Sequence, residues 1–447
     1  MKQPHRGVSF GTMFMLALSV MVLGCTMLIF PRLLGTANIH VDGSEVLAAL
    51  TLHDGFPSLA LSDIPLSDAT QIPEATALPA SQATMDVPEA TAAPTSTPFP
   101  GGTVTLTFGG SINIEEAIRK SAYYSDSGKY DFSEIMALVR DELQSDLTMV
   151  SLENITYDAD KVSAVNAPSA VMDMLADAGV DVVALGFSKA MDKGLDGLQA
   201  TVHTAQNRGI SNIGAYANQA DADELRLFTM DNVDVAYLHY TETISANGRK
   251  AINTEHAAYA LPTIYIVGIP DGMFADIRSA RAAGADVVIV SLNWGKVSAS
   301  KPTAQQKELA QLLADAGADI IIGAGSRVVQ PVTWLTSRDA KGNIRHTLCA
   351  WSLGSLLNES RKDGNVLGML LQLKISFDGT ALSFEKVCYT PTYIWRYKQD
   401  GQYQYRIAVS DQPAPDGMSD EQVGYMEKAY RNLQKYLGDS PVTLRMK

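Results

Sequence analysis

The longest run of apolar positions in the chain is Val8–Phe30, which contains no charged side chain. As a helix rising about 1.5 Å per residue, this run would be roughly 34 Å long and could cross a bilayer. Basic residues precede the run, and after Arg32 the next one is Arg119. Because positive charge stays on the cytoplasmic side, the pattern predicts a cytoplasmic segment 1–7, a single transmembrane helix 8–30 in the cell membrane, and an extracytoplasmic remainder.

A cleaved signal sequence is the alternative interpretation of the same run. The Val-Leu-Gly-Cys that ends at Cys25 loosely resembles a lipoprotein signal. The apolar run continues to Phe30, however, whereas the apolar core of a cleaved signal is about 7–15 residues long. We therefore expect an uncleaved anchor that contains Cys25.

Two further segments precede the folded part of the chain. The juxtamembrane residues 31–62 are weakly apolar and remain unassigned. Residues 63–100 contain seven prolines among Ala, Thr and Ser, have no basic residue, and repeat Pro-Glu-Ala-Thr-Ala at 73–77 and 88–92. Such a composition buries too little apolar surface to offset the entropy of ordering, so it predicts a linker that holds a domain away from the membrane.

The pattern of residues 101–447 predicts one α/β domain. It begins with a strand at 104–108, an amphipathic helix at 132–143 and a strand at 147–152. One phrase then recurs three times: a helix end, a glycine suited to a left-handed cap, and an unbroken apolar strand. Strands without alternation are covered on both faces, so helices should be layered around largely buried sheets. The three copies span 176–185, 281–290 and 314–323.

The last third of the chain shows a different order of elements. Strands at 344–353, 366–376 and 381–389 follow one another without intervening helices, which predicts an antiparallel second sheet. An amphipathic helix over 419–437 closes the chain.

Composition narrows the class of protein. The chain has 447 residues with 35 basic and 49 acidic side chains, a net charge of −14. That sign argues against a nucleic-acid partner. Three cysteines are too few for a disulfide scaffold or a zinc cluster. We expect Cys349 and Cys388 on neighbouring strands, where a disulfide is conceivable but two unpaired thiols are favoured.

Ligands of open α/β sheets collect at the carboxyl ends of the strands. Polar residues follow most of the predicted strands at those ends. The segments concerned are 108–111, 151–154, 186–189, 237–240, 291–295, 323–327 and, on a later strand, 351–355.

These motifs and their order resemble the CapA family, which is associated with poly-γ-glutamate capsule synthesis and related to the calcineurin-like metallophosphoesterases. The resemblance runs from about Gly102 to the last helix and implies a metallophosphoesterase-type sandwich. The pieces that carry it are Asp192-Lys-Gly194, Asn293-Trp-Gly295, Gly-Ala-Asp-Ile-Ile-Ile-Gly at 317–323, Val328-Val-Gln330 and Ser352-Leu-Gly354.

The departures from the family pattern bear on the chemistry. In the family, the strand ends look like Gly-Asp, Asn-x-Glu, Asn-Asn-His, His-Trp-Gly and Gly-x-His-x-His, a set able to bind divalent metals and activate water. Only the glutamate of the second motif, Glu153, is retained. The positions of the lost ligands hold Gly110, Lys189, Asn293, Gly325 and Arg327. We therefore expect no divalent metal and no other cofactor.

The resemblance still implies a cleft at these strand ends. Lys189 and Arg327 are either solvated charges or two cations that line this cleft. Trp294 is expected in its wall, and His239 is expected to pack at the sheet edge rather than act as a ligand. The residues assigned to the cleft are Gly110, Ser111, Glu153, Asn154, Ser188, Lys189, His239, Asn293, Trp294, Ser326, Arg327 and Ser355.

Two functions fit this pattern. The first is a membrane-anchored, catalytically degenerate CapA-like protein of capsule or envelope polymer biosynthesis or attachment. It would bind an anionic envelope polymer, or membrane proteins of capsule synthesis. The alternative is an envelope hydrolase or transferase of the metallophosphoesterase-like class, still active through Glu153, the one weak catalytic candidate. The absence of a replacement nucleophile motif favours the first.

Overall fold

The computed structural model describes residues 101–157, 165–264, 271–339 and 341–445. The predicted transmembrane helix 8–30, the juxtamembrane segment and the linker 63–100 lie outside these ranges. Among the described residues, no helix combines the length and the apolar character needed to cross a membrane.

The first of two large sheets has nine strands, seven of them in the order β18-β17-β16-β1-β4-β7-β8. The strands β1, β4, β7 and β8 run parallel, and β16, β17 and β18 are added antiparallel to the β1 side. The bounds are β1 Gly102–Ile112, β4 Leu147–Leu152, β7 Val182–Ala184, β8 Ser211–Ile213, β16 Leu367–Phe377, β17 Leu382–Gln399 and β18 Gln402–Val409, with β15 Ser355–Leu357 beside β1 and β19 Thr443–Leu444 beside β17.

The second sheet has six strands in the order β13-β14-β12-β11-β10-β9. Its central strands β10, β11, β12 and β14 are parallel, and an antiparallel strand lies at each edge. The bounds are β9 Leu227–Met230, β10 Val233–Thr241, β11 Val287–Asn293, β12 Ile320–Ala324, β13 Val332–Arg338 and β14 Ile344–Ala350.

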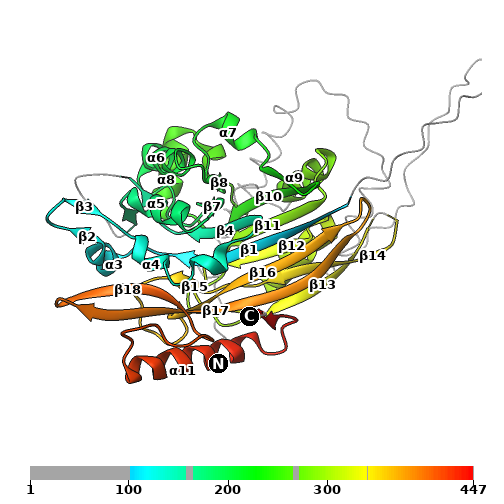
Figure 1. The fold of residues 1–447 in the computed structure, drawn as a ribbon. Coiled ribbons are helices and arrows are strands. Elements are labelled where there is room, and N and C mark those ends of the chain that lie inside the picture. The colour runs from blue at the N-terminus through cyan, green and yellow to red at the C-terminus, as the bar shows by residue number, and fades with distance from the viewer. Residues whose placement is uncertain (1–100, 158–164, 265–270, 340, 446–447) are drawn as a thin grey trace, which may run out of the picture. The chain divides into compact units, whose positions relative to one another are not determined.

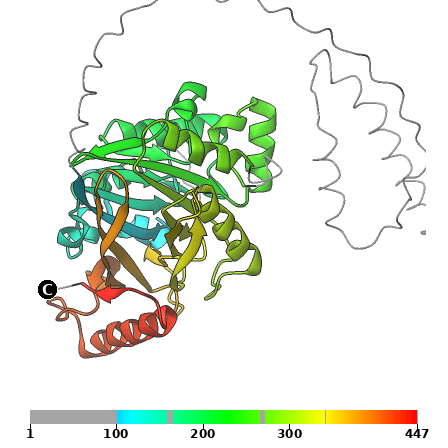
Figure 2. The same cartoon turned by 90° about the vertical axis from the view of Figure 1, so that its right-hand side faces the viewer.

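The two sheets pack face to face, and helices cover their outer faces (Figures 1 and 2). Apolar side chains such as Phe108, Ile289 and Met369 fill the space between the sheets. Burial of this surface, at about 25 cal/mol per Å², is the main force that holds the layers together. The covering helices are α3 Glu116–Ser121, α4 Ser133–Met136, α5 Ala170–Asp177, α6 Gly194–Gln206 and α8 Ala246–Glu255 on the first sheet, and α9 Asp271–Ala282 and α10 Ala304–Ala316 on the second.

The last helix, α11 Asp420–Leu437, lies on the inner face of the first sheet. Its buried residues Met426, Ala429 and Leu433 belong to the inter-sheet core, and in Figure 1 it runs below β17. The helix predicted over 419–437 is present, and a capping box at Ser419 begins it.

The recurring helix–glycine–strand phrase is confirmed in all three places. Gly179, Gly284 and Gly317 have φ angles of 85°, 99° and 116°, in the left-handed region that favours glycine. The strands β7, β11 and β12 follow within a few residues. The layered α/β fold is therefore the one expected.

Two details of the expected fold are wrong. The helix predicted over 132–143 is broken into α4 and a 3₁₀ turn at Arg140–Leu143. Backbone bonds from Val139 to Met136 and from Glu142 to Val139 tighten the chain there while its apolar side chains stay in the core. The apolar spacing thus predicts the buried face but not the bend.

The three late strands do not form a sheet of their own. β14 belongs to the second sheet, whereas β16 and β17 extend the first sheet beside β1. The short connections make β16 and β17 antiparallel neighbours, but no local pattern specifies which sheet they join. As a result Cys349 and Cys388 are not on neighbouring strands, and both are free thiols.

Candidate functional site

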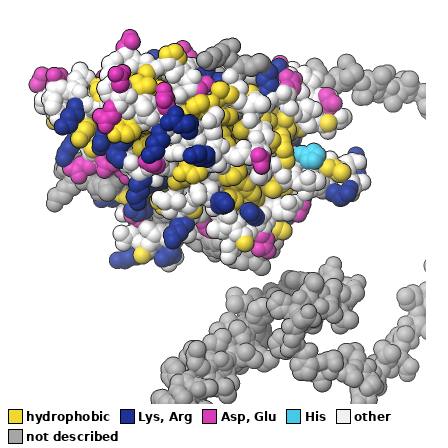
Figure 3. Space-filling view, turned by 90° about the horizontal axis from the view of Figure 1, so that it is seen from below, with side chains coloured by type: hydrophobic (Ala, Val, Ile, Leu, Met, Phe, Trp, Pro, Cys, Tyr) yellow, Lys and Arg dark blue, Asp and Glu magenta, His cyan; other side chains and the backbone are white. Residues whose placement is uncertain are grey.

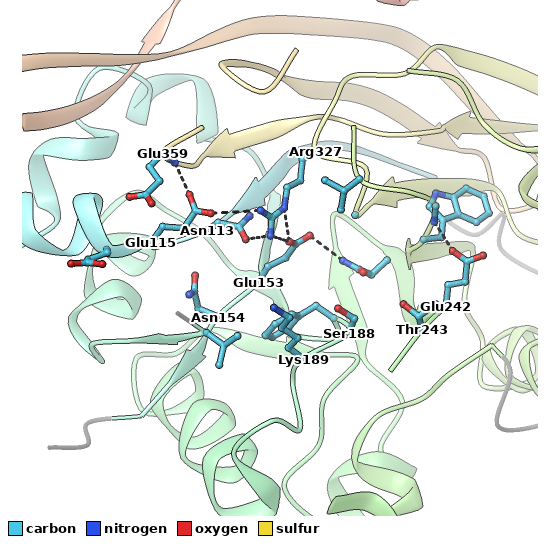
Figure 4. Close-up of a pocket in the computed structure, with 18 of the residues that line it drawn as sticks. Asn113, Glu115, Glu153, Asn154, Ser188, Lys189, Glu242, Thr243, Arg327 and Glu359 are labelled. Carbon is cyan, nitrogen blue, oxygen red and sulfur yellow. Dashed lines mark hydrogen bonds and ion pairs between the residues drawn. The ribbon is translucent and has the colours of Figure 1, made fainter. Parts of the chain in front are cut away.

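A cavity of about 640 Å³ opens at the carboxyl ends of the parallel strands (Figure 4). Segments that follow β1, β4, β7, β10, β11 and β12 converge on it from both sheets. We call it the central pocket. Its lining includes Asn113, Glu115, Glu116, Arg119, Glu153, Asn154, Phe187, Ser188, Lys189, Glu242, Thr243, Asn293, Trp294, Gly295, Gly325, Arg327 and Glu359.

An ion pair between Arg327 and Glu153 occupies the middle of the central pocket. Arg327 Nη2 lies 2.9 Å and Nε 3.2 Å from Glu153 Oε2. Asn293 Nδ2 donates to the other carboxylate oxygen, Oε1, at 3.2 Å. Asn113 Oδ1 accepts from Arg327 Nη2 at 2.5 Å, and Glu115 Oε1 lies 3.7 Å from Nη1. Both oxygens of Glu153 are therefore already engaged.

The loop after β12 holds Arg327 in this position. The backbone φ of Arg327 is 60°, a left-handed conformation that is uncommon for a residue with a side chain. The Ser355 hydroxyl donates to its carbonyl at 3.3 Å, and the adjacent Ser326 hydroxyl bonds Ser352 at 2.9 Å. The guanidinium thus comes from the second sheet and its main partner Glu153 from the first.

The residues present do not fit a divalent metal. A Cβ at Gly110 would lie 2.4 Å from the carbonyl oxygen of Gly354, so the backbone leaves no space for a carboxylate there. Gly325 has a φ of 97°, and a Cβ would lie 2.8 Å from Trp294 O. Arg327 places positive charge against Glu153, the one retained ligand. At Gly110 and Gly325, where the family pattern has metal ligands, the packing leaves no room for a side chain. At a third such position, Arg327 supplies a cation.

The rim of the central pocket is acidic. Glu359 and Glu115 tie the end of β1 to the segment after β15, since Glu359 N donates to Glu115 and Ala117 N donates to Glu359, at 2.8 and 2.7 Å. Glu242 accepts from Gly295 N at 2.5 Å. The lining carries five carboxylates, at residues 115, 116, 153, 242 and 359, against three cations, at residues 119, 189 and 327.

Two groups of the lining are available to a ligand. Lys189 is exposed, and the ion pairs formed among the described residues do not include it. Asn113 Nδ2 is buried and has no hydrogen-bond partner within the described part of the chain. A buried amide donor without a partner is costly, so it favours a bound acceptor such as a carbonyl or hydroxyl oxygen.

The structure brings seven of the twelve predicted residues together in the central pocket. They are Glu153, Asn154, Ser188, Lys189, Asn293, Trp294 and Arg327. The other five do not line it and are buried: Gly110, Ser111, His239, Ser326 and Ser355. Lys189 and Arg327 both line this pocket.

His239 connects the two sheets instead of facing the cavity. Its Nε2 lies 2.9 Å from Gly186 O and its Nδ1 2.7 Å from Ser291 Oγ. Because a carbonyl only accepts, Nε2 carries the proton and Nδ1 accepts from the serine. Burial lowers the pKa of His239 to about 4, so the ring is neutral at pH 7.

Trp294 forms part of the pocket wall, as expected. It stacks on Trp351 with ring centroids 5.7 Å apart, and its Nε1 donates to Trp351 O at 3.2 Å. Both rings are buried. The two stacked faces cover each other.

Sequence reasoning missed the acidic rim because β1 is longer than predicted. It ends at Ile112 rather than at 108, so the side chains that enter the cavity come from Asn113 onward, and Gly110 and Ser111 lie within the strand. Glu242 follows β10 in the same way. The only sequence signal for Asn113 and Glu242 is that each directly follows an apolar run.

The fold and the site define a class of protein: a two-sheet α/β sandwich with a polar pocket at the carboxyl ends of its strands, in which an arginine pairs with a glutamate. Residues 105–360 match the model of the family described as "Bacterial capsule synthesis protein PGA_cap". Because this match covers more than half of the chain, the protein belongs to that family. The resemblance to CapA proteins is confirmed.

Two curated relatives are named CapA. The chain is 29% identical over 227 residues to "Capsule biosynthesis protein CapA" of Bacillus anthracis, covering 50% of this chain and 51% of the relative. It is 28% identical over 195 residues to "PGA biosynthesis protein CapA" of Bacillus subtilis (strain 168), covering 42% and 49%. The chain thus spans about half the length of these relatives.

Solved structures are more distant. A hypothetical protein from Thermus thermophilus matches with a TM-score of 0.35 and 16% identity, over 64% of this chain and 99% of that one. A sulfate thiohydrolase SoxB of the same organism, in complex with glycerol, matches with a TM-score of 0.34 and 10% identity, over 74% and 60%. Similarity this low carries no functional information to the present chain.

Proposed function

We propose that this protein is a non-catalytic member of the capsule-synthesis family that acts by binding. In this proposal residues 8–30 anchor it in the cell membrane and the domain 101–447 lies outside the cell. The domain supports the synthesis or attachment of a capsule or envelope polymer, and it binds its partner in the central pocket.

The observation that carries the proposal is the Arg327–Glu153 ion pair. A catalytic base needs a free lone pair directed at the proton it removes. Both oxygens of Glu153 accept from Arg327 or Asn293 instead. The guanidinium supplies the charge that balances Glu153, which disfavours recruitment of a metal cation by this carboxylate and leaves few of its lone pairs free to act on a substrate. These contacts argue against the alternative, a hydrolase or transferase active through Glu153.

The charge of the lining bears on the partner. Five carboxylates against three cations, one of them spent on Glu153, make the central pocket unfavourable for an extended polyanion. Of the two partners considered from the sequence, the pocket therefore favours a membrane protein of the capsule-synthesis machinery that presents basic or hydrogen-bond-donor groups. Lys189 and Asn113 Nδ2 would meet an acceptor on the same partner.

The proposal is tested in the host that carries this chain, by measuring envelope polymer after replacement of the chromosomal copy. The double variant Glu153→Gln, Arg327→Gln removes the only catalytic candidate and keeps two hydrogen-bonding side chains of similar size. We expect polymer to be retained. In contrast, Ser188→Trp fills the pocket and should abolish polymer, since it blocks binding.

The matched control is Ser383→Trp, which adds the same ring at an exposed position on β17 outside the pocket. It should leave polymer unchanged. Loss of polymer in the double variant, with its melting temperature close to the wild-type value, would favour catalysis through Glu153 and contradict the proposal.

A further inference from the structure

A second cavity, of about 530 Å³, lies between β17 and α11. Its lining residues fall between 361 and 432, beyond the segment 105–360 that matches the family. We call it the β17 cleft. The lining includes Arg361, Arg396, Lys398, Tyr403 and Tyr425.

The cleft follows an edge of β17 that no strand covers among the described residues. The ladder between β16 and β17 ends at the pair Leu367–Tyr393. Beyond that pair, side chains meet the strand: Arg361 Nη1 donates to Ile394 O, and Gln422 Nε2 donates to Arg396 O, both at 3.2 Å. The cleft is therefore preformed by an extended strand and a packed helix.

The charge of the β17 cleft is opposite to that of the central pocket. Four cations line it against two carboxylates. Asp363 pairs with Lys428 at 2.7 Å, and Glu421 accepts from the Tyr425 hydroxyl at 2.7 Å. Lys428 neutralises Asp363, whereas Glu421 keeps its charge, so three cations, Arg361, Arg396 and Lys398, face one carboxylate and can act on a ligand. Figure 3 views the molecule from the side on which α11 lies, where blue basic side chains are numerous.

Tyrosines give the cleft a second kind of recognition. Tyr425 is 52% exposed and Tyr403 is 42% exposed, so both rings are accessible to a ligand. The Arg396 guanidinium lies 4.3 Å from the Tyr403 ring centroid and the Lys398 ammonium 5.4 Å, so these cations are held beside an aromatic face. An exposed tyrosine presents an apolar face with a polar tip, which suits the flat face and hydroxyls of a sugar ring.

We propose that the β17 cleft binds a segment of an acidic polysaccharide. The carboxylates of the polysaccharide pair with Arg361, Arg396 and Lys398, and one of its sugar rings packs on Tyr425. A carboxylate-bearing polypeptide would use the cations but gain little from the tyrosine, so the observations favour the polysaccharide. This site goes beyond the proposed function, because it assigns a second ligand away from the central pocket and does not depend on what that pocket binds.

The test uses the full-length protein and immobilised polygalacturonate, a polymer of uronic acid, at low salt. We expect Lys398→Glu and Tyr425→Ala each to weaken binding about tenfold or more, which corresponds to the loss of one charge-assisted or stacking contact. Lys435→Glu removes an exposed lysine of α11 outside the cleft, and Tyr124→Ala removes a tyrosine of β2 (Tyr123–Tyr124) that is 55% exposed. Both controls should bind like the wild type.

A second arm replaces polygalacturonate with poly-L-glutamate. Tyr425→Ala should leave this binding unchanged, whereas Lys398→Glu should weaken it. If Lys398→Glu and Lys435→Glu behave alike on polygalacturonate, the cleft is not the site. If Tyr425→Ala binds polygalacturonate as the wild type does, the polysaccharide assignment is overturned. The pocket variant Ser188→Trp should bind polygalacturonate normally, so failure of this inference is distinguishable from failure of the proposed function.

Discussion

Arg327 combines a left-handed backbone, a side chain that is 28% exposed and an ion pair with a carboxylate that is only 8% exposed. A carboxylate buried to that extent depends on its partner, because removal of one charge leaves the other in a poor environment. The same residue thus stabilises the fold and fills the central pocket. At the residue scale, the stability of the fold and the charge of the central pocket both depend on one guanidinium.

We predict that Arg327→Ala lowers the free energy of unfolding by about 3 kcal/mol, because Glu153 is left buried without its cation. Urea unfolding measures this change. Lys189→Ala, which removes an exposed cation of the same pocket, should have little effect. Adding Glu153→Gln to Arg327→Ala should recover part of the loss. Equal stability of Arg327→Ala and Lys189→Ala would show that the ion pair is not structural.

His239 makes the free energy of unfolding depend on pH. Its pKa is lowered to about 4 by burial, below the value near 6.5 of an unfolded histidine. The unfolded chain therefore binds a proton that the folded chain excludes, so this contribution is complete above about pH 6.5 and is lost as the pH falls toward 4. The expected size is roughly 3 kcal/mol.

The measurement is urea unfolding at a series of pH values between 7 and 4.5. His239→Gln can still bond Gly186 and Ser291 but cannot be protonated, so its stability should fall less steeply over this range. An identical slope for the variant and the wild type would mean that other groups cause the acid loss.

At the scale of elements, β1 sets the geometry of the central pocket. Gly110 lets neighbouring backbone approach the strand closely, since a Cβ there would meet Gly354 O at 2.4 Å. This contact is made by the segment that leads into β15, with Ser111 N donating to Gly354 O at 3.0 Å. The strand therefore continues through the position where the family has an aspartate.

We predict that Gly110→Ala destabilises the protein by about 1–3 kcal/mol through overpacking. The control is Gly424→Ala on α11, where a Cβ meets nothing within 4 Å. That change should stabilise by up to about 1 kcal/mol, since alanine favours a helix. Thermal unfolding distinguishes the two. If Gly110→Ala melts with the wild type, the site is open enough for a ligand side chain.

The elements that could be predicted from sequence are those with an unbroken local pattern. The segment 147–152, the three helix–glycine–strand phrases and α11 all appear where expected. The end of β1 could not be predicted, because glycine is depleted in strands and Gly109-Gly110 therefore suggests a strand end. The strand continues through this glycine pair because Gly110 packs against the backbone of Gly354, more than 200 residues away in the chain.

The candidate site was predictable to a similar extent. Residues that directly follow apolar strands, such as Glu153, Lys189 and Arg327, could be assigned to one cavity. The pattern of apolar and polar positions does not indicate which charged side chains form ion pairs with each other. The pairing of Arg327 with Glu153 follows from the packing of the two sheets, and Glu359 enters from a segment with no strand-end signal.

At the scale of the whole molecule, charge is distributed unevenly. The chain carries a net charge of −14. In the lining of the central pocket carboxylates outnumber cations, whereas in the lining of the β17 cleft cations outnumber carboxylates. A polyanion would be repelled at long range, so its binding to the cleft should be weak and steeply dependent on salt.

The proposed anchor gives a prediction at this scale. The full-length protein should remain in the membrane fraction after high-salt and alkaline washes, because a spanning helix is held by the hydrophobic effect rather than by charge. Protease applied from outside should release a fragment that starts within residues 63–100. Recovery of a soluble mature protein that begins near residue 26 would contradict the anchor.

The central claim, that Arg327 and the closed glycine positions replace a metal site, is tested most directly by metal titration. The full-length protein is purified, its metal content is determined, and its melting temperature is followed as Mn²⁺, Zn²⁺ or Fe²⁺ is added. Binding to the folded state alone would raise the melting temperature. The account predicts no stoichiometric metal and no saturable rise, whereas a rise that saturates at one or two equivalents would contradict it.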